Sequence, residues 1–249
     1  VGLNNPPVVM AGGVWHLKDW SHWRDSPEIG PIAFQFGSRP ILTKESPVPD
    51  RWKQRLITLK EGDISLNRFS PTGFYSSAIR NRFLRELEGR HMRQIPYSTT
   101  PEGVMTEALP VGPRKRPVYV ELQDKDRAEK WVLEGFEDAM KTPDSTLVFV
   151  TKEESVQIHQ DQIDCMGCLS HCKFSNWKDH DDFSTGKKAD PRSFCIQKTL
   201  QDVAHGTGDM EEQVMFAGHN AYKFATDPFY ANGNIPSVKQ LVDRIITGE

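Results

Sequence analysis

The chain has 249 residues, of which 37% are hydrophobic and 26% are charged, and its formal net charge at pH 7 is −3. This composition is typical of a globular protein with room for one large domain or two smaller ones. Because the charge is nearly balanced, it indicates neither a nucleic-acid partner nor a membrane surface. No apolar run of about 18 residues predicts a membrane span.

The first residues, "VGLNNPPVVMAGG", contain no charged segment followed by an apolar run, so we expect no secretory signal and a cytoplasmic location. Four cysteines in a chain of this length argue against a disulfide scaffold and favour reduced thiols. The sequence lacks an initial Met and enters a strand pattern almost at once. We therefore expect the C-terminal portion of a longer protein.

The N-terminal stretch predicts one strand–helix–strand repeat. Residues 6–13, "PPVVMAGG", are an apolar run of strand length that ends in two glycines, and residues 30–40, "GPIAFQFGSRP", repeat this pattern. Between them, Trp15, Leu17, Trp20 and Trp23 have helical spacing. Continuous apolar strands joined by such a crossover are typical of a parallel sheet that is covered on both faces.

Further elements follow in chain order. Helical patterns occupy residues 49–62, 71–89 (after a turn), 124–141, 199–205, 210–225 and 235–248, and strand patterns occupy 117–122 and 145–150. Residues 91–117 are rich in Pro, Thr and Gly and predict irregular structure, and residues 160–200 are polar and loop-like.

A glycine turn directly follows each of the first two predicted strands, Ala11-Gly12-Gly13 and Gly37-Ser38. Without a Cβ atom, glycine lets main-chain N–H groups approach an anion closely. On neighbouring parallel strands two such turns can hold one phosphate, as the loops after the last two strands of a (β/α)8 barrel commonly do. The alternative is that both are ordinary turns without a ligand.

Several runs of sequence carry a resemblance to a known family. They are "PVVMAGGVW", "IAFQFGSRPILTKES", "LNRFSPTGFYSSAIRNRF" and, at the end, "MFAGHNAYKFA" and "IPSVKQLVDRII". Together they resemble the C-terminal half of the nitronate monooxygenase family, over residues 5–90 and 213–249. The resemblance implies an α/β fold: the C-terminal part of a (β/α)8 TIM barrel that carries FMN, followed by an α-rich region with a Cys-rich metal-binding insertion.

The same resemblance implies a division of the chain and a set of FMN contacts. Residues 1–90 would form the last strands and helices of the flavin-binding barrel, 91–212 the insertion, and 213–249 the closing helices. The residues that it implies for cofactor binding are Ala11, Gly12, Gly13, Gln35, Gly37 and Ser38. The family's usual Thr, Phe and Gln are replaced by Ser38, Pro40 and His219, which affects side-chain contacts more than main-chain ones.

The resemblance leaves the catalytic residue unassigned, because the family's catalytic histidine would lie upstream of Val1. We therefore expect a partner that supplies the N-terminal barrel portion, or a homologous subunit. The substrate is expected to be a small molecule, and NAD(P)H is a candidate reductant.

The four cysteines form a separate candidate site. The stretch "DCMGCLSHCKFSNW" places Cys165, Cys168 and Cys172 in a C-x2-C-x3-C pattern, and Cys195 follows. All-cysteine ligation suits a [4Fe–4S] cluster or tetrahedral zinc, and small buried thiols that bind no metal are a third interpretation. The C-x2-C-x3-C spacing resembles that of the dienoyl-CoA reductases, which bind a [4Fe–4S] cluster. His171 and His180 are alternative zinc ligands.

The leading hypothesis is an FMN-dependent oxidoreductase of nitronate monooxygenase or NAD(P)H–flavin oxidoreductase type, with an added [4Fe–4S] cluster. In it the flavin carries the electron chemistry and the protein holds the flavin phosphate. The alternative is a non-catalytic subunit, stabilised by zinc or a cluster, that completes a partner's barrel.

Overall fold

The structure, a computed structural model, describes residues 5–112, 114–169, 171–175 and 189–248. The strands are β1 (Val8–Ala11), β2 (Ile32–Gln35), β3 (Ile64–Asn67), β4 (Ser76–Ile79), β5 (Gln94–Pro96), β6 (Glu107–Val111), β7 (Arg116–Val120), β8 (Asp138–Lys141) and β9 (Thr146–Val150). The helices are α1 (Ser21–Arg24), α2 (Ser38–Ile41), α3 (Asp50–Leu56), α4 (Arg82–Met92), α5 (Leu122–Leu133), α6 (Lys152–Ile163), α7 (Ile196–His205) and α8 (Val238–Thr247). Three 3-10 helices are η1 (Leu17–Trp20), η2 (His219–Thr226) and η3 (Pro228–Gly233).

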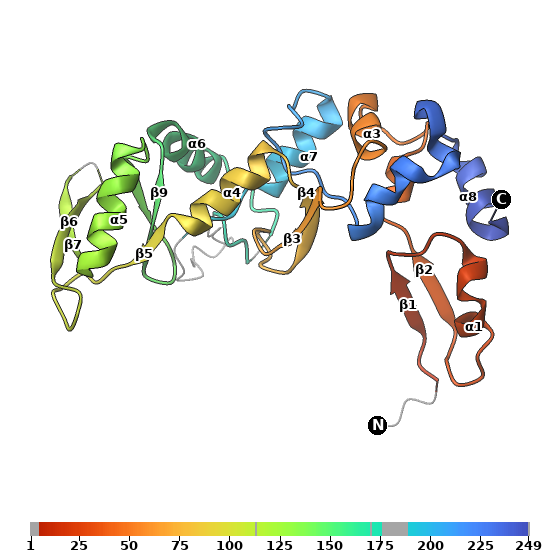
Figure 1. The fold of residues 1–249 in the computed structure, drawn as a ribbon, viewed down its shortest axis with the longest axis horizontal. Helices are drawn as coiled ribbons and strands as arrows, with labels where there is room; N and C mark the ends of the chain where they lie inside the picture. The colour runs from red at the N-terminus through yellow and green to blue at the C-terminus, as the bar shows by residue number, and fades with distance from the viewer. Residues whose placement is uncertain (1–4, 113, 170, 176–188, 249) are drawn as a thin grey trace.

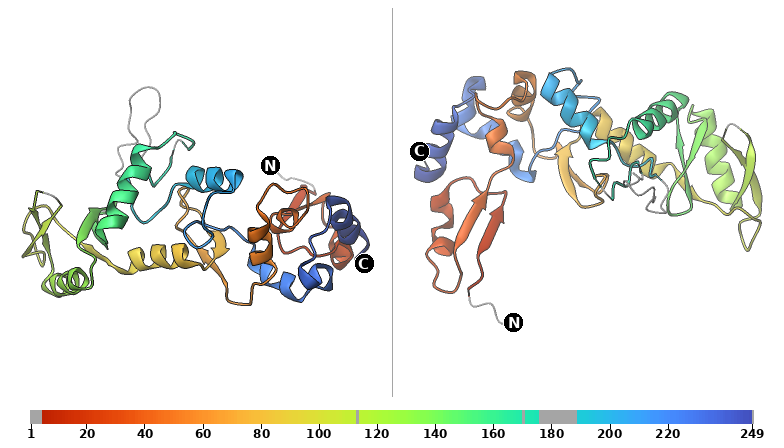
Figure 2. Two further views of the ribbon diagram at one scale, coloured as in Figure 1. Left: turned by 90° about the horizontal axis from the view of Figure 1, so that it is seen from above. Right: turned by 180° about the vertical axis from the view of Figure 1, so that it is seen from behind.

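The elements are spread along an elongated, arched molecule (Figure 1). Strands β5 to β9 lie at one end with α5 and α6, and β1, β2 and α1 form an arm at the other (Figures 1 and 2). Within the described ranges, none of the helices combines the length and the apolar content needed to cross a bilayer.

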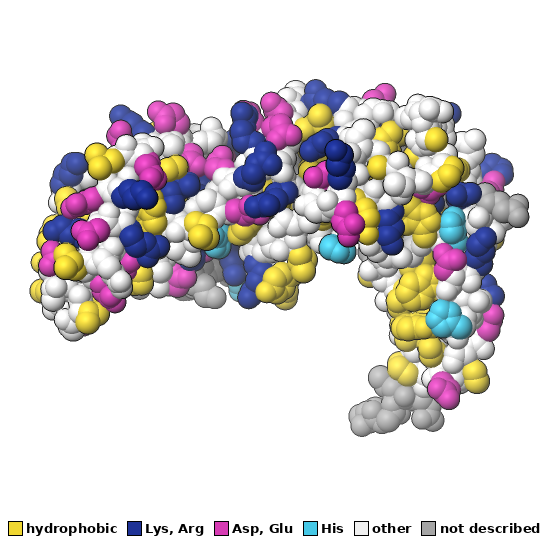
Figure 3. Space-filling model, viewed as in Figure 1, with side chains coloured by type: hydrophobic (Ala, Val, Ile, Leu, Met, Phe, Trp, Pro, Cys, Tyr) yellow, Lys and Arg dark blue, Asp and Glu magenta, His cyan; other side chains and the backbone are white. Residues whose placement is uncertain are grey.

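Strands β1 and β2 pair in parallel, with Val8 opposite Ile32 and Ala11 opposite Gln35. Because η1 and α1 connect them, the predicted strand–helix–strand repeat is confirmed. The prediction that this sheet is covered on both faces is wrong for the described residues, since half-buried and exposed positions alternate along both strands. Val9, for example, is 61% exposed. Figure 3 shows hydrophobic side chains gathered on the side of this arm that turns toward the rest of the molecule.

The described residues form no closed barrel. Besides the β1–β2 pair, they contain the antiparallel pairs β3–β4 and β6–β7 and the antiparallel sheet β5–β9–β8. The fold is therefore mixed α/β. The part of the chain expected to be α-rich also holds β5 to β9, so that expectation is corrected.

Some expected elements are present and others differ. Helices α3, α7 and α8 and strands β7 and β9 lie where the sequence patterns predict them. The helix predicted over 124–141 is confirmed only as far as the end of α5, because residues 138–141 form β8. The helix predicted over 71–89 is confirmed only in its second half, as α4, because residues 76–79 form β4. Residues 91–117, expected to be irregular, instead form β5, β6 and the start of β7, because Leu109 and Val118 pair across the hairpin and are buried in one cluster. The predicted helix over 210–225 is wrong in its first half. There the Ile79 amide donates to the Met215 carbonyl at 2.9 Å, so this segment extends along β4.

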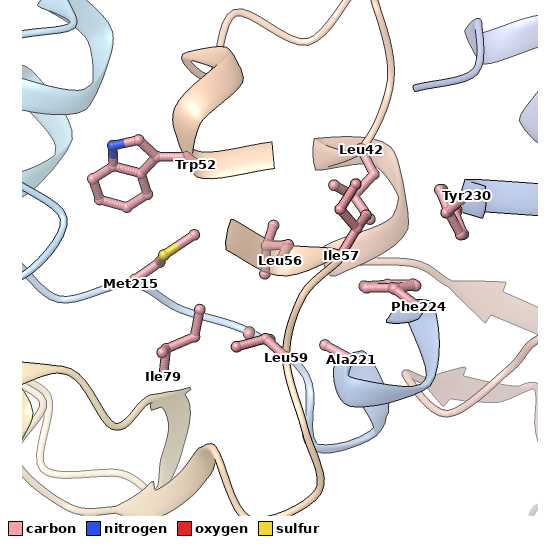
Figure 4. Close-up of a cluster of buried hydrophobic side chains, with 11 residues drawn as sticks. Leu42, Trp52, Leu56, Ile57, Leu59, Ile79, Met215, Ala221, Phe224 and Tyr230 are labelled. Carbon is pink, nitrogen blue, oxygen red and sulfur yellow. The ribbon is translucent and has the colours of Figure 1, made fainter. Parts of the chain in front are cut away.

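The largest buried cluster among the described residues joins residues 42–79 to the returning C-terminal segment. Leu42, Leu56 and Leu59 are at most 1% exposed. Figure 4 shows these side chains gathered with Met215 and Phe224 from the C-terminal segment. Residues 213–235 thus share a core with residues 42–79, while the boundaries at 90/91 and 212/213 stay a prediction.

Asn81 links helix α4 to the returning chain. Its side-chain oxygen accepts from the Leu84 amide at 2.9 Å and so caps the N-terminus of α4. Its side-chain nitrogen donates to the carbonyls of Met210 at 2.6 Å and Gln213 at 2.7 Å. Since Asn81 is 2% exposed, water cannot replace these bonds readily.

Replacing Asn81 by Ala is therefore expected to lower the free energy of unfolding by about 2–3 kcal/mol, because it removes the cap and leaves two carbonyls without a donor. Chemical denaturation of the purified chain measures this change. The matched control is Ser237→Ala, which removes only the cap of α8 and is expected to cost about 1 kcal/mol. Equal losses in the two variants would contradict the linking role of Asn81.

Candidate functional site

A cavity of about 620 Å³ lies at the ends of β1 and β2. Residues from three segments, 11–15, 35–41 and 216–224, line it together with Ser77. The third segment is distant in sequence from the first two. Every residue that the sequence predicts for cofactor binding lines this one cavity, namely Ala11, Gly12, Gly13, Gln35, Gly37 and Ser38. The structure thus brings the two predicted turns together.

The first turn depends on two successive glycines in the left-handed region. Gly12 has φ +79° and Gly13 has φ +72°, which residues with a Cβ adopt only at a cost. The Gly12 amide donates to the Gln35 carbonyl at 3.1 Å and so extends the pairing of β1 with β2. Among the described residues, the amides of Gly13 and Gly37 donate to no carbonyl.

The space beside these turns is open. An added Cβ at Gly12 or at Gly37 would meet no atom of the protein within 4 Å. Free amides next to open space are what an anion needs if it is to approach the main chain.

Ser38 connects the second turn to the C-terminal segment. The Gly218 amide donates to the Ser38 hydroxyl at 2.7 Å, and an added Cβ at Gly218 would lie only 3.3 Å from that oxygen. Asn220 borders the first turn, because its side-chain nitrogen lies 3.6 Å from the position of a Cβ on Gly13. Residues 218–220 therefore form the third wall, and His219 lines the cavity there.

Arg39 is a cavity residue that the sequence reasoning did not assign. It is 4% exposed and stacks on Trp15, with its guanidinium carbon 5.1 Å from the ring centroid. One guanidinium nitrogen donates to the Trp15 carbonyl, whereas Nε and Nη2 have no hydrogen-bond partner in the structure. The available signal was its position directly after Gly37-Ser38. Its buried positive charge beside the two turns favours an anion in the cavity.

Asp227 fixes the indole of Trp15. The Asp227 carboxylate accepts from the Trp15 indole nitrogen at 2.8 Å, the Phe229 amide at 2.9 Å and the Arg244 guanidinium at 3.2 Å. Nearby, burial raises the pKa of Tyr230, and its closeness to Arg39 partly offsets this effect. Asp227 thus orients an aromatic wall of the cavity.

A second pocket, of about 180 Å³, is lined by all four cysteines of the chain, Cys165, Cys168, Cys172 and Cys195. It shares no lining residue with the larger cavity. All four thiols are free, and Cys168 is the exposed one. Burial raises the pKa of Cys168, and the charges of the other three cysteines add to this.

The cysteines share a pocket without converging on a point. Among the described residues, no group of three or more His, Cys, Asp or Glu side chains is placed to hold a metal ion. His171, an alternative ligand in the sequence analysis, does not line the pocket. His180 lies outside the described residues.

Comparison with known proteins gives one family. A family model described as nitronate monooxygenase matches residues 4–248, which is nearly the whole chain. No curated protein and no solved structure matches it.

Replacing Asp227 by Ala is expected to lower the free energy of unfolding by about 3 kcal/mol, because it leaves Arg244 and the Trp15 indole without their acceptor. The matched control is Asp243→Ala, which removes the exposed ion pair to Lys239 and is expected to cost less than about 0.5 kcal/mol. Thermal and denaturant unfolding measure both. If Asp227→Ala lowered the free energy of unfolding no more than Asp243→Ala does, Asp227 would not be needed to hold Trp15 in the cavity wall.

Proposed function

Because the chain belongs to the nitronate monooxygenase family, a family of flavin-dependent oxidoreductases, we propose that it binds FMN in the larger cavity and acts on a small-molecule substrate. The observation that carries the proposal is the meeting of two glycine turns, with unpaired amides and open space, at the ends of adjacent parallel strands. The family match over nearly the whole chain favours this enzyme over a non-catalytic subunit.

The residues fit the phosphate of FMN. The turns at Gly12-Gly13 and Gly37-Ser38 supply main-chain donors, and glycine leaves room for close approach. Arg39 adds a buried positive charge beside them. These features support assigning the phosphate end of the cofactor to this corner of the cavity.

The rest of the cavity suits the flavin ring and a small substrate. Trp15, Phe216 and Phe224 contribute apolar wall that keeps water from the ring, and His219 and Asn220 contribute polar groups. When bound, FMN supplies the electron transfer, and NAD(P)H is our candidate reductant. We assign no catalytic base among the described residues.

We also propose that further strands cover the β1–β2 sheet, supplied by an N-terminal barrel portion or by a homologous subunit. Parallel sheets occur almost only with both faces covered, whereas here exposed positions alternate along both strands. The four free thiols support a cytoplasmic location. The family carries FMN, so a metal centre at the cysteines would be an addition by this chain.

The direct test is FMN binding by Gly12→Ala and by its matched control, Gly62→Ala. Both glycines have positive φ, +79° and +91°, and neither has an atom within 4 Å of an added Cβ, but only Gly12 lines the cavity. Both variants are expected to lose about 1 kcal/mol of stability from the strained backbone. Only Gly12→Ala is expected to weaken FMN binding, by at least about tenfold.

Titration with quenching of flavin fluorescence measures the affinity, and reduction of the bound flavin by NAD(P)H without oxygen tests the reductant. Equal FMN affinity in both variants, or no FMN binding by the unaltered chain together with the strands that complete its sheet, would contradict the proposed site. A flavin that binds but is not reduced by NAD(P)H would exclude only that reductant.

A further inference from the structure

Two distant segments bring the cysteines to one pocket. Cys165, Cys168 and Cys172 lie in the segment after helix α6, and Cys195 is the residue that precedes helix α7. The four are all the cysteines that the chain has, and all line the pocket of about 180 Å³. If the cysteines were only small side chains that pack without a ligand, nothing would require all four to line the same pocket.

Local turns direct the first three thiols to the same place. Gly167 has φ +67°, which lets the chain reverse between Cys165 and Cys168. Its amide donates to the Cys165 sulfur at 3.4 Å, and the Cys165 thiol in turn donates to the Ser175 hydroxyl at 3.0 Å. A second turn, closed by the Cys172 amide on the Leu169 carbonyl at 3.2 Å, orients Cys172. Hydrogen bonds to sulfur are among the contacts that tune ligand thiolates.

The wall behind Cys172 and Cys195 is apolar, whereas the pocket itself is also lined by the charged residues Asp161, Asp164 and Lys198. Cys172 and Cys195 pack against a buried cluster of Met140, Val148, Val150, Ile158 and Phe174. The Cys195 side chain makes no capping bond to helix α7, although the helix N-terminus favours a negative charge there. Thiolates held against such a wall need a positive centre to compensate their charge.

We infer that the four cysteines are the ligands of a [4Fe–4S] cluster. In such a cluster each thiolate binds a different iron atom, so the four sulfurs surround a volume rather than a point. A single zinc ion needs all of its ligands at about 2.3 Å. All four thiols line one cavity of about 180 Å³, which fits a centre whose ligands surround a volume.

The cluster would tie the cysteine segment and the start of helix α7 to the sheet β5–β9–β8. The buried wall behind Cys172 and Cys195 consists of residues from β8, β9 and α6 together with Phe174. Because the cysteine pocket and the FMN cavity share no lining residue, the proposed cluster can be tested independently of FMN binding.

The test is elemental analysis of the full-length chain, produced with iron and sulfide and purified without oxygen. We expect about four iron atoms and about four acid-labile sulfides per chain, and an electron paramagnetic resonance signal after reduction by dithionite. Stoichiometric zinc without sulfide, or four thiols that remain titratable with no metal bound, would overturn the inference. These measurements on the unaltered chain decide the question even if a variant fails to fold.

Cys168→Ser and Cys195→Ser are each expected to lose most of the iron and sulfide while they keep FMN binding. The matched control is His171→Ala, which alters a side chain between two proposed ligands that does not line the pocket. It is expected to keep the full iron content. Loss of iron in His171→Ala, with iron retained in Cys195→Ser, would contradict ligation by the four cysteines.

Discussion

The larger cavity depends on the packing of two parts of the chain that are distant in sequence, and the hydrogen bond from the Gly218 amide to the Ser38 hydroxyl joins these parts at its wall. This packing brings residues 218–220 against the two glycine turns, where the buried cluster shared by both parts supports them. Neither part encloses the cavity alone. Asp227 then holds Trp15 in place, and Trp15 in turn stacks on Arg39.

The glycines are required by backbone conformation and by the space available for a side chain, not by any chemical group that they contribute. Gly12 and Gly13 adopt a left-handed backbone, and a side chain at Gly218 would make Ser38 shift by a few tenths of an ångström. The result is a cavity wall made largely of main chain, in which amide groups rather than long side chains face a ligand. The cysteine pocket is built in the opposite way, since there the side chains supply the proposed ligands and glycine only shapes the turn between them.

Local sequence signals predicted the local features of this fold. The apolar runs that end in glycine predicted β1 and β2, and the helical pattern over residues 235–248 predicted α8, which the structure shows capped by Ser237. Long-range pairing escaped prediction: residues 213–218 carry a helical pattern but extend along β4, and Pro110 and Pro117 lie in a hairpin that packing holds together. Arg39 was missed for a related reason, because its burial against Trp15 exists only in the folded chain.

The central claim is that main-chain amides of two adjacent turns hold the phosphate of FMN. Hydrogen exchange of the full chain with and without FMN, read by mass spectrometry on short peptides, tests it most directly. Our account predicts slower exchange in both segments, residues 11–15 and 35–41, when FMN is added, and unchanged exchange in residues 164–169. Protection confined to one turn, or placed only at the cysteine segment, would contradict it.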